Sequence, residues 1–340
     1  MPKAVALFSG GLDSQLAVNL MLEQGVDVEC LTVVSVFHQA AAGPEHPAAR
    51  AAARLGVPIT LVDLNDEMLA MVKNPRFGRG KNMNPCVDCR ILLLRRAADR
   101  MRETGANFIV TGEVLGQRPM SQRRDAIRRI EREAGVEGYV LRPLSARLLN
   151  PTVPETEGLV DREKLLAIRG RSRREQMALA ETLGITDYPS PAGGCLLTDP
   201  GFAFRLRDLL ERRDACLHDV ELLRVGRHFR LDDCTKLVMG RHEAENARLE
   251  ALAQPGDRLL DAADVTGPTA LLRGDTREAN VETAAQLTLK YGKAKDEAAA
   301  RVTVRKAGTD ESSDVTVAPA TDDEVKRLLI TKRPAAEGQR

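Results

Sequence analysis

The chain has 340 residues, which is enough for two domains and a sizeable core. Hydrophobic residues make up 43% and charged residues 29%, a balance typical of a globular protein and not of a disordered chain. The formal net charge is +1 and Trp is absent, so the chain is not a polycation. Any binding of nucleic acid has to use a local basic surface instead of broad stacking platforms.

Two further features bear on where the protein works. No apolar run is long enough to cross a bilayer, and Met1-Pro2-Lys3 leads into an apolar segment without the pattern of a signal peptide. We therefore expect a cytoplasmic protein that has no membrane partner. In that compartment the six cysteines do not form a disulfide framework and need another explanation.

The N-terminal stretch is typical of a strand, a glycine turn and a helix. The apolar residues 4–8 precede Ser9-Gly10-Gly11-Leu12-Asp13-Ser14, and a helical pattern runs over residues 15–23. A short apolar run bounded by a turn suits a buried strand of a parallel sheet. The glycines let the backbone approach a ligand closely, and the helix directs its first N–H groups into the turn. This arrangement predicts a phosphate site.

Apolar segments and helical patterns alternate along the first part of the chain. We predict further strands over residues 26–36, 58–64, 106–112 and 138–144, and helices over residues 47–55, 91–104, 173–183 and 202–212. Such alternation predicts an α/β fold with a doubly wound parallel sheet. The ligand should then lie at the carboxyl ends of the strands, where the glycine turn is.

Beyond residue 212 the pattern changes to short strand-like pieces. Strands are predicted over residues 220–231, 236–239, 258–260, 270–273, 300–305 and 314–318, with a helix over residues 279–291. We therefore predict a first domain over residues 1–212, a smaller α+β domain over residues 213–331 and a frayed polar tail over residues 332–340.

Three cysteines are candidates for chemistry. Cys86 and Cys89 form a C-x-x-C before a predicted helix, and Cys195 follows a glycine-rich turn far away in the sequence. Four interpretations stay open: a zinc site, which usually needs four protein ligands, a redox dithiol, which leaves Cys195 unexplained, an iron–sulfur cluster on three cysteines, and plain structural cysteines. We interpret the others as packing residues, namely Cys30, Cys216 and Cys234.

Arginine is concentrated in two runs, over residues 118–132 and 162–174. One interpretation is a solvated helix face with pairs to neighbouring acids, and the other is a surface that follows the phosphates of a nucleic acid. Two such runs in the same half of the chain favour an RNA-facing surface. Its candidate residues are Arg118, Arg123, Arg124, Arg171 and Arg174.

The sequence of residues 9–14 resembles the PP-loop of the N-type ATP pyrophosphatases, which split ATP into AMP and pyrophosphate. Asn84-Pro85-Cys86-Val87-Asp88-Cys89 is similar to the tRNA 2-thiouridylases. Thr111-Gly112-Glu113-Val114-Leu115-Gly116-Gln117 is similar to the catalytic domain of the tRNA 4-thiouridine synthetases. Residues 225–229 and 240–246 look like the RNA-binding domain of NFACT-type proteins.

The resemblance implies an adenine nucleotide alpha hydrolase-like fold that uses ATP and Mg²⁺. A uridine carbonyl oxygen attacks the α-phosphate, pyrophosphate leaves, and sulfur then displaces AMP. The implied ATP-binding residues are Ser9, Gly10, Gly11, Asp13, Ser14, Gly112 and Gln117. Asp13 and the three cysteines are the implied catalytic residues. Cys86, Cys89 and Cys195 would either hold a 4Fe–4S cluster, with zinc as the alternative, or supply persulfide and resolving thiols, and their number favours the cluster.

The implied partners are tRNA and a sulfur donor, which is either sulfide or the persulfide of a cysteine desulfurase. A homodimer is compatible with this reading. The chain begins at the PP-loop strand, without the THUMP domain that 4-thiouridine synthetases usually carry, so RNA capture should fall to the second domain. Two rival hypotheses are a PP-loop ligase acting on a small molecule and a non-catalytic RNA-binding factor.

Overall fold

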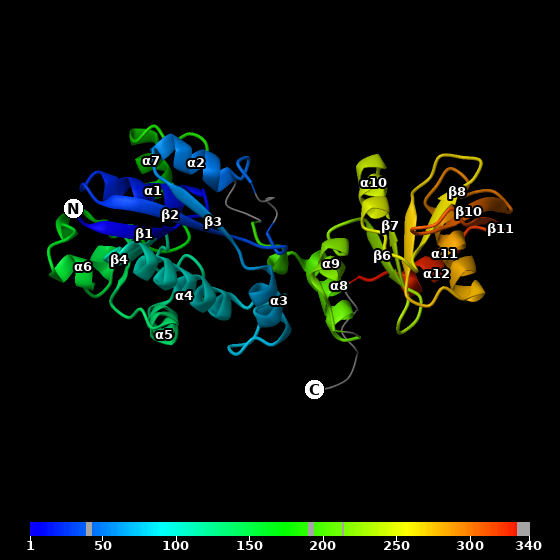
Figure 1. The fold of residues 1–340 in the computed structure, drawn as a ribbon, viewed down its shortest axis with the longest axis horizontal. Helices are drawn as coiled ribbons and strands as arrows, with labels where there is room; N and C mark the ends of the chain where they lie inside the picture. Colours follow the sequence, from blue (N-terminus) through cyan, green and yellow to red (C-terminus); the bar gives the residue numbers. More distant parts are fainter. Residues whose placement is uncertain (39–42, 190–193, 213, 332–340) are drawn as a thin grey trace. The chain divides into compact units, whose positions relative to one another are not determined.

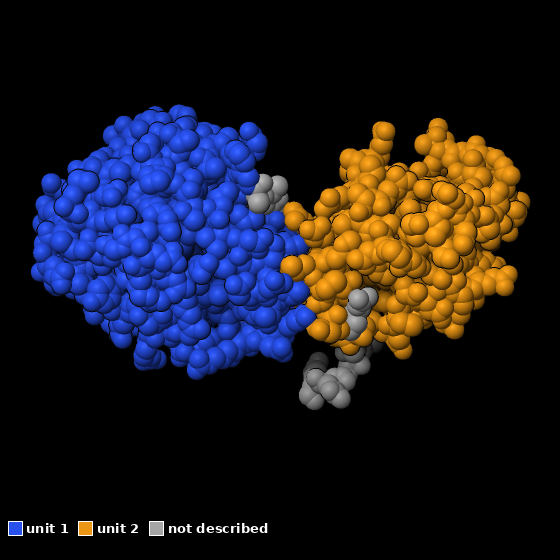
Figure 2. Space-filling view, in the orientation of Figure 1, with its two compact units in different colours: residues 1–198 blue, residues 199–340 orange. Residues whose placement is uncertain are grey.

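The structure is a computed structural model that describes residues 1–38, 43–189, 194–212 and 214–331. The chain divides into two compact units, residues 1–198 and 199–340, which have different colours in Figure 2. The predicted tail, residues 332–340, and Gly193 of the turn before Cys195 lie outside the described residues. No helix within the described ranges is long and apolar enough to span a membrane.

The described part of the first unit contains a five-stranded parallel sheet in the order β3-β2-β1-β4-β5. Its strands are β1 (Lys3–Leu7), β2 (Asp27–Val34), β3 (Ile59–Asp63), β4 (Phe108–Thr111) and β5 (Val140–Leu141). Its helices are α1 (Leu12–Leu22), α2 (Pro47–Leu55), α3 (Asn65–Lys73), α4 (Cys86–Thr104), α5 (Arg124–Ala134), α6 (Val153–Thr156) and α7 (Arg174–Thr182). Short 3₁₀ turns occupy Ala146–Leu148, Arg162–Lys164 and Leu196–Thr198.

Helices cover both faces of this sheet (Figure 1). Alternate residues of β1 point to opposite faces, so Ala4 and Ala6 pack in the buried cluster that includes α1 and α2, while Val5 packs in the cluster that includes α4 and α5. A strand buried on both faces is a continuous apolar run, which is why β1 and β4 could be found in the sequence. The predicted doubly wound α/β fold is confirmed.

Helix α4 differs from its prediction in a way that matters for the site. It begins at Cys86 instead of residue 91, directly after Pro85. Asp88 in its first turn accepts hydrogen bonds from the backbone N–H groups of Arg76 at 2.9 Å and Phe77 at 3.1 Å, which fixes the preceding loop on the helix. The C-x-x-C therefore lies within the first turn of a helix and not in a loop before it.

The described part of the second unit contains a six-stranded antiparallel sheet in the order β11-β10-β8-β9-β7-β6. Its strands are β6 (Arg227–Arg230), β7 (Lys236–Met239), β8 (Arg258–Ala262), β9 (Ala270–Arg273), β10 (Ala300–Lys306) and β11 (Ser312–Val317). Its helices are α8 (Pro200–Leu210), α9 (Leu217–Leu222), α10 (Glu243–Ala251), α11 (Glu278–Lys290) and α12 (Asp322–Leu328). The predicted smaller α+β domain is confirmed.

The boundary between the compact units lies after Thr198, whereas the sequence placed it after residue 212. Helix α8 accounts for the difference. Asp199 caps this helix and accepts a hydrogen bond from Phe202 N at 2.7 Å, and Asp208 forms an ion pair of 2.5 Å with Arg230 of β6. These contacts fix α8 to the second unit. From the sequence alone, this helix had been assigned to the first domain.

Two other sequence predictions for the second unit need correction. Residues 217–222 form α9 and not part of a strand, because Asp219 accepts a hydrogen bond from Cys216 N at 3.1 Å and starts a helix there. Cys216 and Cys234 are both exposed, so their interpretation as packing residues is wrong. Cys30 in β2 is 0% exposed, which confirms its packing role.

Candidate active site

The loop between β1 and α1 lies where the strand order of the sheet reverses. β1 and β4 are neighbours in the sheet, but α1 packs on one face and α5 on the other. Open α/β sheets bind their ligands in the crevice at such a point. Gly112, directly after β4, lies against the loop, because a Cβ added there would be 2.5 Å from the carbonyl carbon of Asp13. The structure thus brings together Gly112 and residues 9–14.

The backbone of this loop is arranged to receive an anion. Gly10 has a φ of +72°, and a Cβ added to it would lie 2.8 Å from the backbone of Ala48. Gly11 is the N-cap of α1, and no side chain of the described residues caps it, since Ser14 Oγ donates instead to Gly11 O at 2.8 Å. The first N–H groups of α1, at the positive end of the helix dipole, therefore have no side-chain cap among the described residues, and such a helix end is suited to an anion.

Only one of the two carboxylate oxygens of Asp13 accepts a hydrogen bond from the described residues. Its Oδ2 accepts a hydrogen bond from Gln117 Nε2 at 3.0 Å, whereas its Oδ1 is buried without a hydrogen-bond partner among the described residues. Arg173 Nη2 lies 3.9 Å from that Oδ1, and within the same ranges the buried Nε of Arg173 also lacks a hydrogen bond. Buried polar atoms without partners are costly unless a ligand satisfies them. The pair fits a site where Asp13 meets a cation such as Mg²⁺ and Arg173 a phosphate.

Arg173 was not among the predicted ATP-binding residues, although it belongs to the second arginine run. The sequence offered no means of separating it from Arg171 and Arg174 in the same run. In the structure Arg171 and Arg174 are exposed, whereas the side chain of Arg173 is 17% exposed and lies beside Asp13. Burial and proximity to the loop distinguish this arginine, and both depend on the tertiary fold.

Replacing Gly112 with alanine is expected to lower both the stability of the protein and its affinity for nucleotide. The added methyl group would overlap the backbone of Asp13 and the backbone nitrogen of Ser14, 2.6 Å away. Overpacking of this kind costs about 1–3 kcal/mol. Thermal unfolding with and without ATP measures the effect. Gly194→Ala is the control, because a Cβ there meets nothing within 4 Å among the described atoms. Equal behaviour of the two variants would contradict the close packing.

The three candidate cysteines form one group. Cys86 and Cys89 lie three residues apart in α4 and so share a helix face. Burial is the main reason that the pKa of Cys89 rises to about 12. Arg90 opposes this rise, and the neighbouring Cys195 and Cys86 add to it. Burial, with a smaller contribution from Cys86, also raises the pKa of Cys195. The three thiols therefore lie within electrostatic reach of one another, and burial disfavours the thiolate forms of Cys89 and Cys195.

Backbone pairing brings Cys195 to this position. Residue 195 forms an isolated antiparallel bridge with His38, just beyond β2. The N–H of Met83 donates to Leu197 O at 3.2 Å, so the other side of the segment contacts the residues that lead into α4. His38 was not among the predicted site residues, and its pairing with Cys195 depends on the tertiary fold.

Two asparagine side chains strengthen the same link. Asn82 Nδ2 donates to Thr198 O at 2.6 Å, and Asn84 Nδ2 donates to Cys86 Sγ at 3.2 Å. Asn84 entered the sequence analysis only as part of the Asn-Pro-Cys stretch, and neither side chain was predicted to act. One loop thus contacts both the Cys195 segment and the C-x-x-C.

The described residues contain no group of three or more His, Cys, Asp or Glu side chains that could hold a metal ion. Cys86, Cys89 and Cys195 are neighbouring thiols in this arrangement, and the cluster or zinc ion expected at them stays a prediction. We therefore derive no chemical step through a metal at these cysteines.

A buried ion network connects the cysteine helix with the end of β4. Glu113 is 5% exposed and lies 3.3 Å from Arg90 Nε and 3.0 Å from Arg142 Nε. Arg142 also pairs with Glu131 of α5. Removing one partner from a buried pair typically costs about 3–5 kcal/mol, so such a network resists distortion. Arg90 adjoins Cys89, and the network therefore fixes the cysteine helix relative to the candidate nucleotide site.

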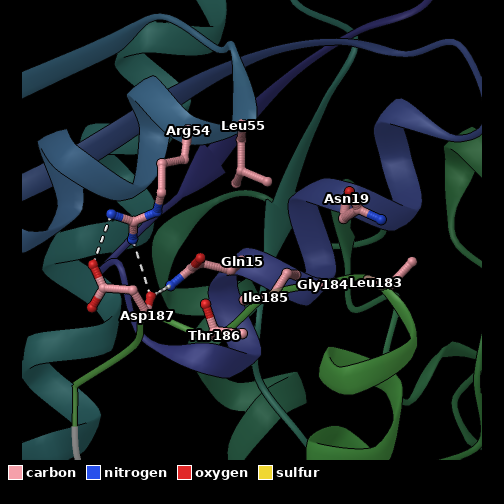
Figure 3. A pocket seen from close by; sticks show the side chains of 9 residues that line it. All are labelled: Gln15, Asn19, Arg54, Leu55, Leu183, Gly184, Ile185, Thr186 and Asp187. Carbon is pink, nitrogen blue, oxygen red and sulfur yellow. Dashed lines mark hydrogen bonds and ion pairs between the residues drawn. The ribbon is translucent and has the colours of Figure 1, made fainter.

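A cavity of about 290 Å³ lies beside the loop, between α1, α2 and the segment after α7 (Figure 3). Gln15 Nε2 donates to Gly10 O at 2.8 Å and to Asp187 O at 3.1 Å, and Arg54 forms an ion pair of 2.8 Å with Asp187. None of the predicted site residues lines this cavity. We assign its polar contacts a structural role, because they hold the segment after α7 against the nucleotide loop.

Two of the candidate RNA-contacting arginines come from neighbouring loops. Residues 115 and 169 form an isolated parallel bridge, and Gly170 N donates to Leu115 O at 2.7 Å. This pairing places the loop of Arg118 beside the loop of Arg171, and both arginines are exposed. The other candidates are exposed as well, namely Arg123, Arg124 and Arg174. The two arginine runs, separate in sequence, therefore meet in the first unit.

Two family models match the chain. Residues 1–147 match the model described as thiamine biosynthesis protein (ThiI), and residues 226–329 match the NFACT protein RNA binding domain. The first match includes the loop after β1, the C-x-x-C and Gly112. The chain is therefore similar to ThiI over its first part and to the NFACT protein RNA binding domain over its second, in agreement with the resemblance of its motifs.

Curated relatives match mainly the first unit. The chain is 36% identical over 118 residues to the tRNA-specific 2-thiouridylase MnmA of Pelobacter propionicus, which covers 33% of this chain and 33% of that protein. It is 27% identical over 244 residues to the tRNA-specific 2-thiouridylase MnmA of Methylorubrum populi. This alignment covers 66% of this chain and 60% of that protein. The chain thus spans between 33% and 60% of the length of these relatives.

Among solved structures, a 4-thiouridine synthetase in complex with RNA and bound ATP aligns at 24% identity with a TM-score of 0.37. The alignment covers 65% of this chain and 52% of that chain. An alignment with so low a TM-score carries no argument about function.

Proposed function

We propose that this protein is an ATP-dependent tRNA thiouridine synthase, which replaces a carbonyl oxygen of a uridine with sulfur. The observation that carries the proposal is the presence of two sites in one unit, a phosphate-binding loop with an unsatisfied Asp13 oxygen and a group of three cysteine thiols. Activation of a carbonyl by ATP and delivery of sulfur need these two kinds of site. The similarity of the first unit to ThiI and MnmA proteins supports the same assignment.

In the first step, ATP binds with its phosphates at the first N–H groups of α1 and beside Arg173. Asp13 would hold Mg²⁺, which neutralises phosphate charge when bound. The uridine oxygen attacks the α-phosphorus, the bond from this phosphorus to the bridging oxygen breaks, and pyrophosphate leaves. The chain contributes positioning, through the loop, and stabilisation of negative charge, through Arg173 and the helix N-terminus.

In the second step, the cysteine group delivers sulfur. A persulfide on one cysteine attacks the activated carbon with its terminal sulfur, and AMP leaves with the former carbonyl oxygen. A second thiolate then attacks the sulfur that is still bound to the first cysteine, which releases the thiolated base and forms a disulfide. The two cysteines are oxidised and the transferred sulfur is reduced, so a thiol reductant has to restore the site before the next turnover.

Several finer features stay predictions. A 4Fe–4S cluster or zinc at the cysteines is tested by iron, sulfide and zinc analysis of protein purified without oxygen. The identity of the sulfur donor, the position of sulfur on the base, a homodimer and a cytoplasmic location need separate experiments.

Removing the charges of Arg118 and Arg171 is expected to weaken the binding of all tRNAs to a similar extent, whatever their sequence. Because each phosphate contact releases counterions, the slope of log K against log salt should fall by about 0.9 for each arginine in the double variant Arg118→Gln, Arg171→Gln. Binding of tRNA across a salt series measures this slope. The control Arg96→Gln, Arg102→Gln removes the same charge from the exposed side of α4. An equal loss in both double variants would place the RNA surface elsewhere.

Release of pyrophosphate from ATP, measured with and without tRNA, tests the proposed activity. We expect release that depends on tRNA. Release that does not respond to tRNA would favour a ligase acting on a small molecule. No release under either condition, with a folded protein, would favour a non-catalytic RNA-binding factor.

A further inference from the structure

A separate group of buried basic side chains lies in the second unit. β6 and β7 pair antiparallel with Arg230 directly opposite Lys236, and His228 lies on the same sheet face, two residues before Arg230. Like charges directly opposite each other destabilise a strand pair. Helix α8 adds Arg205 and Asp208 to this face, and Asp208 pairs with Arg230. The face thus collects more positive than negative groups.

Several buried polar atoms of this group have no partner among the described residues. Lys236 is 7% exposed and His228 is 2% exposed. Lys236 Nζ, His228 Nδ1 and Arg205 Nε are buried and make no hydrogen bond to any described residue. Other atoms of two of these side chains do have partners. His228 Nε2 lies 2.7 Å from Val225 O, and Arg205 Nη1 donates to Gly226 O at 3.3 Å. The free donors of Lys236 and Arg205 are therefore held in place without a protein acceptor, and the neutral imidazole of His228 donates through Nε2 and leaves Nδ1 as an acceptor without a partner.

The acids that act on the group already have other partners. Asp199, which acts on Arg205, caps α8, and Asp219, which acts on Lys236, accepts from Cys216 N and lies 3.7 Å from Arg273 Nη1. Asp208 accepts hydrogen bonds from Arg230 Nη2 at 2.5 Å and from Arg212 Nε at 3.3 Å. Glu245 accepts from Arg241 Nε at 3.0 Å. Within the described ranges, Lys236 and Arg205 consequently have no hydrogen-bonded carboxylate, although a buried charge normally has one.

We propose that Lys236, His228 and Arg205 form a binding site for a phosphate group. A phosphate supplies what this group lacks, which is negative charge beside the cations and acceptor oxygens for the donors of Lys236 and Arg205, and for His228 Nδ1 once the anion favours the protonated imidazole. Inorganic phosphate and a phosphate of an RNA chain share this chemistry. In the RNA case the site rests on the proposed function and names residues of the second unit that contact RNA.

The electrostatics of the three residues agree with this site. Burial, followed by the charges of Lys236 and Arg205, holds the pKa of His228 well below its usual range. Burial lowers the pKa of Lys236 to about 7, although Asp208 opposes the shift. Arg205 acts on both residues, so the three groups lie within electrostatic reach of one another. A bound anion would favour the charged forms that burial disfavours.

Thermal unfolding of the full chain, measured as inorganic phosphate replaces chloride at constant ionic strength, tests the site. We expect the Tm of the wild type to rise by roughly 5–10 °C when phosphate is about 100-fold above its dissociation constant. Phosphate also stabilises folded proteins in general, so the difference between variants is the measured quantity. Lys236→Met should lose the specific rise. Lys326→Met, which removes a lysine with a 77% exposed side chain from the same unit, should keep it.

An equal phosphate dependence of Tm in the wild type and Lys236→Met overturns the proposal. If Lys236→Met does not fold, Arg205→Gln serves the same purpose, because its amide can still donate to Gly226 O, and an undiminished rise in that variant overturns the proposal equally. Binding of tRNA at several salt concentrations distinguishes free inorganic phosphate from an RNA phosphate as the ligand of this site. An RNA phosphate in the site predicts a salt slope that is about 0.7–0.9 smaller in Lys236→Met. An unchanged slope, with the Tm rise lost, assigns the site to free phosphate. The Tm measurement needs no thiolation activity, so its failure is distinct from failure of the proposed function.

Discussion

Asp13→Asn is expected to reduce pyrophosphate release by about 10²–10³-fold, the range seen when one charge-stabilising group of an active site is lost. The side chain keeps its shape and an oxygen that can accept the hydrogen bond from Gln117. It loses the negative charge that faces Arg173 and that a phosphate-bound cation requires. The fold should survive, because the substitution removes a buried charge and adds no volume. Steady-state release of pyrophosphate in the presence of tRNA measures the effect.

Asp66→Asn is the matched control for this variant. Asp66 is an exposed acid in the first turn of α3, so the same atoms change at an equivalent helix position away from the loop. We expect its rate to equal that of the wild type. If Asp13→Asn releases pyrophosphate as fast as Asp66→Asn, the loop after β1 is not the site of ATP cleavage.

Cys195→Ser is expected to reduce thiolation by about 10³-fold or more, as loss of a covalent nucleophile does, while tRNA-dependent pyrophosphate release continues. Serine has nearly the same size but cannot carry a persulfide or form a disulfide. Cys195 lies with Cys86 and Cys89 and is absent from the contacts of Asp13 given above. The substitution therefore separates sulfur transfer from activation of the base. Mass spectrometry of the tRNA nucleosides and a pyrophosphate assay on the same sample measure the two steps.

Cys234→Ser provides the control, because Cys234 is exposed and lies in the second unit. It should leave both steps unchanged. Thiolation by Cys195→Ser at the wild-type rate would show that this cysteine only packs against His38 and Leu197. Loss of both steps together would instead indicate that Cys195 supports the structure of the nucleotide site.

The central strands of the first unit could be predicted because they are buried on both faces. β1, β2 and β4 are nearly continuous apolar runs, and the glycine turn after β1 has its own signature in Gly10 and Gly11. In the second unit the longer helices α8 and α11 could be predicted, whereas the shorter α9, α10 and α12, with 6, 9 and 7 residues, were not. The start of helix α12 nevertheless has a local signature, because Thr321 and Glu324 form a capping box.

The candidate site was predictable only where residues are adjacent in sequence. Residues 9–14 and the C-x-x-C could each be recognised from a local pattern. Their spatial relations could not, because Cys195 reaches Cys86 through backbone pairing with residue 38, and Arg173 reaches Asp13 across 160 positions of the chain. The lack of a partner for Lys236 could not be predicted either, because it becomes evident only when β6, β7 and α8 are packed together.

The most direct test of the account is mass spectrometry of tRNA nucleosides from a strain that lacks this gene. We predict the loss of one thiolated uridine, restored by the wild-type gene and by Cys234→Ser, but not by Asp13→Asn or Cys195→Ser. An unchanged set of thiolated nucleosides, in a strain without a redundant enzyme, would contradict tRNA thiolation.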